Sequence, residues 1–139
     1  MQAGTYCLVV HVPLSIPVSI GCLSRFVLTP GYYLYLGSAL NGLEGRLDRH
    51  LRRDKRLRWH IDHLLTAGQV VETWCVASGE RQECAWAQAA LGAPGARMAI
   101  KGFGASDCRC PAHLVHFRCR PTPDLIFDGT VKLRRTVYG

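Results

Sequence analysis

Three segments near the start of the chain are rich in apolar, β-branched or aromatic residues, as is typical of strands, and in the second of them apolar and polar positions also alternate. These strands are predicted at residues 5–12, 21–31 and 32–37. Two prolines in VPLSIPVSIG favour a loop after the first strand, and a Pro-Gly pair separates the second strand from the third. The simplest arrangement of the three strands is an antiparallel meander.

After these strands, the apolar period lengthens to that of a helix. Leu43, Leu47 and Leu51 recur every fourth residue and predict the buried stripe of a helix. Asn41 can cap this helix, with Glu44 as its partner in a capping box. The elements predicted from here on are helices over 42–53, 58–68 and 80–91 and strands over 69–77 and 113–119.

This order of elements predicts an α+β fold, with a small, mainly antiparallel sheet flanked by helices. The chain has 139 residues, which is enough for one domain with a hydrophobic core. We assign residues 1–120 to that domain. Residues 121–139 begin PTP and are basic, so we expect them to form a loosely packed C-terminal tail.

The composition narrows the class of protein. The formal net charge is +7, and residues 46–58 hold seven arginines and lysines against two aspartates, so an anionic partner such as nucleic acid is favoured. No apolar run is long enough to cross a membrane, and the N-terminus reads as a strand rather than a signal peptide. Seven cysteines without a framework spacing indicate a reducing, cytoplasmic setting.

Five blocks of sequence occur together in one order: GTY at 4–6, GYYLYLGSALNGLEGRLDRHLR, RWHIDHLL, ECAWA and GFGASDCRCPAHL. GTY and the YLG at 35–37 resemble the paired signature of the GIY-YIG nuclease superfamily, and the ordered set resembles its Uri-type branch. The resemblance covers residues 4 to about 118. Thr5 departs from the middle isoleucine of the signature, but it is also β-branched, so the strand is retained.

The resemblance implies an endonuclease that hydrolyses DNA with one divalent cation, Mg²⁺ or Mn²⁺. Carried over residue by residue, the catalytic positions are Tyr6, Tyr35, Arg46, His50 and Glu83, and Glu83 is the metal ligand. A lone carboxylate suits Mg²⁺, which keeps most of its waters, and an arginine can fork two phosphate oxygens. Glu80 is a rival carboxylate one turn earlier, and only the resemblance separates the two.

The attacking water needs a base, and the residues leave the choice open between the two tyrosines and His50. The contacts expected with DNA come from Ser38, Arg49, Arg53, Arg56 and His60. Gly37 before Ser38 lets backbone approach a ligand closely. For the arginines of 49–56, a solvated helix face is the competing interpretation.

Two other functions fit parts of the sequence. The same fold without catalysis would be a DNA-binding module whose affinity falls steeply with salt. A structural zinc site is the second, from Cys108-x-Cys110-x-x-His113 completed by Cys84 or His63. The Cys-x-Cys spacing is tighter than in the usual zinc knuckle, which favours packed thiols instead.

Overall fold

A computed structural model describes residues 2–20, 25–39, 41–52, 54–57, 59–104 and 112–138. The strands are β1 (Gly4–Val12), β2 (Ile16–Ser19), β3 (Arg25–Leu28), β4 (Gly31–Ala39), β5 (Gln69–Ala77), β6 (Arg97–Met98), β7 (Leu114–Phe117) and β8 (Arg134–Val137). The helices are α1 (Leu43–Leu51), α2 (His60–Leu64) and α3 (Glu83–Leu91), with a 3-10 turn over Pro123–Leu125. In the described part of the chain, no helix is long and apolar enough to cross a membrane.

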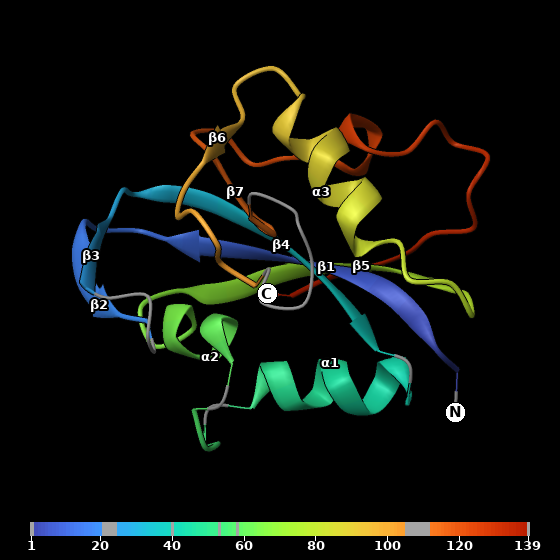
Figure 1. The fold of residues 1–139 in the computed structure, drawn as a ribbon, viewed down its shortest axis with the longest axis horizontal. Helices are drawn as coiled ribbons and strands as arrows, with labels where there is room; N and C mark the ends of the chain where they lie inside the picture. Colours follow the sequence, from blue (N-terminus) through green and yellow to red (C-terminus); the bar gives the residue numbers. More distant parts are fainter. Residues whose placement is uncertain are drawn as a thin grey trace.

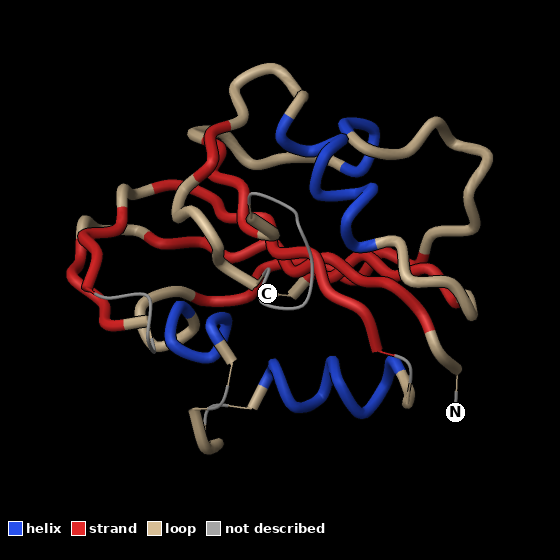
Figure 2. Tube along the Cα trace, viewed as in Figure 1, coloured by secondary structure: helices blue, strands red, loops and turns tan. Residues whose placement is uncertain are grey.

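Six of these strands form one sheet in the order β6-β7-β4-β1-β5-β8, with every pair antiparallel. Helices α1 and α2 cover one face of this sheet and α3 covers the other (Figures 1 and 2). An antiparallel sheet flanked by helices confirms the predicted α+β class.

Central strand β1 is buried on both faces, and its alternation sorts side chains between two cores. Tyr6 and Leu8 point to the face of α1 and α2, while Cys7 and Val9 join the core under α3. In β4 the same rule places Tyr33 and Tyr35 on the first face and Tyr32 on the second, as the sequence predicts. The two signature tyrosines therefore share one face of the sheet.

The predicted three-stranded meander is wrong. β1 pairs directly with β4, and β3 pairs with β2 in a separate two-stranded hairpin. β2 lies in the segment predicted as a loop, and Pro17 is tolerated there because a two-stranded ribbon leaves one edge of each strand unpaired. The hairpin inserted between β1 and β4 explains the long separation of Tyr6 and Tyr35 in the sequence.

Helix α1 differs from its prediction at both ends. Its N-cap is Gly42, with φ 132° and no side-chain cap, so the predicted capping box of Asn41 and Glu44 is wrong. A hydrogen bond from the Leu43 N–H to the carbonyl of Gln2 holds this end instead. At the other end Leu51 is exposed and His50 is buried, because the imidazole turns inward to bond a phenol of the sheet.

The structure differs from the expectation of a loosely packed C-terminal tail, because β8 extends the sheet beside β5. The buried carboxylate of Glu72 explains the attachment. It accepts hydrogen bonds from Arg135 in β8 at 2.5 Å, Arg120 at 2.7 Å and the Trp74 indole at 3.0 Å. Burial raises the pKa of Glu72, but these donors outweigh it and lower that pKa to about 2.

Candidate active site

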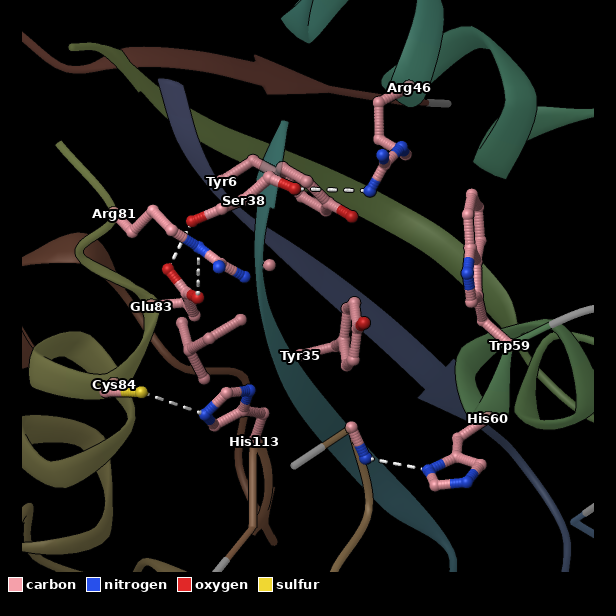
Figure 3. A pocket seen from close by; sticks show the side chains of 13 residues that line it. Tyr6, Tyr35, Ser38, Arg46, Trp59, His60, Arg81, Glu83, Cys84 and His113 are labelled. Carbon is pink, nitrogen blue, oxygen red and sulfur yellow. Dashed lines mark hydrogen bonds and ion pairs between the residues drawn. The ribbon is translucent and has the colours of Figure 1, made fainter. Parts of the chain in front are cut away.

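A cavity of about 430 Å³ opens at the end of the sheet between α1, α2 and α3. Tyr6, Tyr35, Arg46 and Glu83 all line it, although β1, β4, α1 and α3 each supply only one of them. The other polar residues that line it are Ser38, Trp59, His60, Arg81, Cys84 and His113. In Figure 3, Tyr35 lies between the Arg81–Glu83 pair on one side and Trp59 and His60 on the other.

The two signature tyrosines contact each other across adjacent strands, with ring centroids 6.3 Å apart. Tyr6 is almost fully buried, and burial raises the pKa of its phenol to about 12 although Arg46 beside it lowers that pKa. Burial raises the pKa of Tyr35 well above its ordinary value as well. Both phenols are therefore protonated near neutral pH unless a bound group changes their surroundings.

His50 lies behind this pair, outside the cavity lining, and its Nε2 is 2.7 Å from the Tyr6 hydroxyl. Burial lowers the pKa of His50 to about 3, with Lys55 as the next cause, so the imidazole is neutral at pH 7. Its Nδ1 is the one buried side-chain polar atom without a hydrogen-bond partner among the described residues.

This unpartnered nitrogen favours one tautomer of His50. A buried N–H without an acceptor costs more than a buried lone pair without a donor, so the ring proton belongs on Nε2. His50 then donates to the Tyr6 oxygen, and the Tyr6 hydroxyl hydrogen is free to point elsewhere. A donor at this oxygen favours the phenolate, so the histidine prepares Tyr6 to release a proton.

Arg46 is held at the mouth of the cavity by two contacts. Its guanidinium donates to the Ser38 carbonyl at 3.1 Å and lies 4.6 Å from the centre of the Trp59 ring. Both contacts fix the direction of the fork and leave other donor N–H groups on the guanidinium. Arg46 is therefore oriented to bind an anion in the cavity.

Glu83 is buried in the first turn of α3 and has a partner at each carboxylate oxygen. The Ser38 hydroxyl donates to Oε2, and the Arg81 Nε lies 3.3 Å from Oε1 (Figure 3). Glu80, the rival carboxylate, is exposed and does not line the cavity. The geometry thus selects Glu83 between the two.

Glu83 is the carboxylate of the cavity that could hold a divalent cation. Within the described residues, no group of three or more His, Cys, Asp or Glu side chains is arranged to hold a metal. That part of the chain therefore contains no metal site made entirely of protein ligands. Mg²⁺ or Mn²⁺ bound through one carboxylate and several waters is compatible with Glu83. Of the two carboxylate oxygens, Oε1 is contacted by Arg81 and Oε2 accepts from Ser38.

The residues predicted to contact DNA lie in different places. Ser38 and His60 line the cavity, and His60 Nδ1 accepts from the Gly104 N–H at 2.8 Å. Arg49 is turned inward, where it forks the buried carboxylate of Asp62 at 2.8 and 2.9 Å. Arg56 is exposed outside the cavity, and Arg53 lies outside the described residues.

The position of Arg49 is explained by its partner. Asp62 has no exposed side-chain surface, so its carboxylate needs a cation and receives it from one turn of α1. The Arg49 guanidinium also lies 4.1 Å from the centre of the Trp59 ring. Arg49 therefore joins α1 to α2 and supports Trp59, and it is not placed to contact DNA.

Two polar residues of the cavity, Trp59 and Arg81, are missing from the sequence prediction, and His113 was considered there only as a zinc ligand. Trp59 lies in the block RWHIDHLL, where an aromatic side chain beside a basic segment was the available signal. Arg81 precedes Glu83 by two residues, and a cation just before a helix is an unusual choice. His113 lies 3.5 Å from the Cys84 sulfur, whereas Cys108 and Cys110 of the zinc hypothesis lie outside the described residues.

Comparison with known proteins adds a family. The model of the family described as "Domain of unknown function DUF123" matches residues 5–133. No curated protein and no solved structure matches the chain. The matched segment includes every residue that lines the cavity and nearly all of the sheet. The chain belongs to the DUF123 family.

Proposed function

We propose that this chain is a metal-dependent endonuclease that hydrolyses phosphodiester bonds of DNA at a GIY-YIG-type site like that of the Uri-type branch. One observation carries the proposal. Tyr6, Tyr35, Arg46 and Glu83 come from four separate elements and meet in a single open cavity. A packing role alone would not require two phenols, a guanidinium and a carboxylate around one hollow of this size.

Each side chain has a part that its surroundings support. Arg46, oriented by Ser38 and Trp59, binds the scissile phosphate and stabilises the charge that grows on its oxygens. Tyr6 orients the attacking water. To act as its base, the phenol first gives its own proton to solvent in the open cavity, and the phenolate then takes the proton of the attacking water. The high pKa of Tyr6 makes this transfer dependent on Arg46 and on the N–H of His50.

Glu83 would hold the cation, which when bound supplies positive charge for the phosphate oxygens and the leaving oxygen. Ser38 orients the carboxylate by donating to Oε2. Tyr35 is fixed by Phe103, whose ring is 6.0 Å away at 81°, and its phenol borders the same space as Tyr6. His50 is too weak a base, with a pKa of about 3, to replace Tyr6.

Supercoiled plasmid tests the proposal. The wild-type chain should nick it in the presence of Mg²⁺ or Mn²⁺ and not in the presence of a chelator. Glu83→Ala and Arg46→Ala should each abolish nicking while the circular dichroism spectrum is retained. Salt-dependent binding to the plasmid without any nicking would instead establish the non-catalytic DNA-binding module.

A further inference from the structure

We propose that Arg81 forms an ion pair with Glu83 that a divalent cation displaces, and that the released guanidinium then binds the substrate phosphate. This inference rests on the proposed function and assigns to it a residue that the sequence resemblance does not supply. Arg81 is the second cation of the cavity, opposite Arg46 (Figure 3). In this proposal Arg81 binds the Glu83 carboxylate before the metal binds and the substrate phosphate afterwards.

The contact with Glu83 places Arg81 where a metal must bind. Ser38 already donates to Oε2, so Oε1 is the carboxylate oxygen that a cation would reach, and Arg81 Nε lies 3.3 Å from it. A guanidinium and a divalent cation repel each other strongly at such a separation. Metal and Arg81 therefore compete for one oxygen atom.

The Arg81–Glu83 ion pair can open at little cost in free energy. The Glu83 side chain is 9% exposed, whereas the Arg81 side chain is 55% exposed and makes no other ion pair among the described residues. An ion pair with one exposed partner contributes little stability, so releasing Arg81 into solvent is easy. Glu83 stays in place because Ser38 and the first turn of α3 hold it.

Helix stability does not explain an arginine at this position. Arg81 directly precedes Gln82, the N-cap of α3, and a cation is unfavourable at the positive end of a helix. Glu83 offsets this while the pair is closed. Once a metal takes the carboxylate, the guanidinium is released beside the cavity that it lines, which is the proposed binding site for phosphate, an anion that a guanidinium can fork.

The first test measures metal binding without DNA. Mn²⁺ is titrated into the full chain by calorimetry, for the wild type, Arg81→Ala, Arg46→Ala, Arg97→Ala and Glu83→Gln. Arg81→Ala should bind Mn²⁺ up to about five-fold more tightly, since the competing ion pair is gone. Arg97→Ala removes an exposed arginine outside the cavity and should leave the affinity unchanged.

Arg46→Ala removes a cavity cation that makes no hydrogen bond or ion pair with Glu83, so it controls for charge alone and should tighten binding less than two-fold. Equal tightening of Mn²⁺ binding in Arg46→Ala and Arg81→Ala would overturn the proposed competition for Glu83, because the loss of any positive charge from the cavity would then explain it. Unchanged or weaker binding by Arg81→Ala would also overturn it and would leave the proposed function standing. If the wild type shows no Mn²⁺ binding that Glu83→Gln removes, both proposals fail.

The second test follows plasmid nicking at saturating Mn²⁺. Without the phosphate contact, Arg81→Ala should cleave roughly ten- to hundred-fold more slowly, with a raised KM for DNA. Arg81→Lys keeps the charge and should recover part of this loss. Wild-type cleavage by Arg81→Ala would overturn the phosphate contact.

Discussion

A methyl group added at Gly37 should slow DNA cleavage while the protein still folds. An alanine Cβ at this position of β4 would lie 2.5 Å from the Tyr6 hydroxyl oxygen and 2.6 Å from the carbon that bears it. Backbone strain is not involved, because Gly37 is not among the described glycines with positive φ. The Gly37→Ala substitution therefore acts first on the Tyr6 phenol, which supplies the three atoms nearest to the added Cβ.

The size of the effect follows from these distances. An ordinary contact needs at least 3.4 Å, so the phenol must move by about 0.9 Å, which disturbs its 2.7 Å hydrogen bond to His50. A shift of this size in a reacting group costs about 100-fold in rate. Overpacking costs about 1–3 kcal/mol of stability, offset in part by the lower chain entropy of alanine. We expect a folded protein that cleaves DNA about 100-fold more slowly.

Plasmid nicking and urea denaturation measure the two effects separately. Gly45→Ala is the matched control, because Gly45 is exposed on α1 and a Cβ there meets nothing within 4 Å. It should gain up to about 1 kcal/mol of stability and cleave at the wild-type rate. Wild-type cleavage by a folded Gly37→Ala variant would refute the role given to Tyr6.

Other residues give independent predictions. Glu72→Ala should lose about 1–3 kcal/mol in urea denaturation at pH 7, since the buried Trp74 indole N–H loses its acceptor. Because the pKa of Glu72 is lowered to about 2 from 4.5, its contribution is present above pH 4.5 and is lost as the pH falls through about 2. His50→Gln keeps a donor and should cleave within about ten-fold of wild type, His50→Ala should lose about 100-fold, and the pH–rate profile should show no histidine titration between about pH 5 and 8. Arg49→Ala should cost about 3 kcal/mol of stability by removing the cation that forks the buried Asp62 carboxylate, whereas Arg56→Ala should weaken DNA binding and change stability by less than about 0.5 kcal/mol, as measured by salt-dependent binding and denaturation.

The sequence predicts features that depend on local periodicity. The strand at 69–77 is found with the predicted bounds, and the alternation in YYLYLG correctly places Tyr33 and Tyr35 on one face. Such patterns report which side of an element is buried. They do not report which strand it pairs with, and so the strand predicted over 21–31 was assigned to the main sheet, whereas β3 pairs with β2 in a separate hairpin.

The candidate site shows the same limit. The four residues around the cavity were found through the order of the sequence blocks, since nothing local distinguishes Glu83 from Glu80. The role of Arg49 depends on Asp62, which lies 13 residues further on, and the burial of His50 depends on Tyr6, 44 residues earlier. Charge along a helix cannot specify such partners, because long-range packing decides which cation turns inward.

The carboxylate of α3 provides the most direct test of the account. Single-turnover cleavage of a DNA duplex at saturating Mn²⁺ should be compared between Glu83→Gln and Glu80→Gln, two variants that remove the same charge within one turn of chain. The account predicts a loss of at least about 1,000-fold for Glu83→Gln and a rate within two-fold of wild type for Glu80→Gln. Equal rates in the two variants would contradict it.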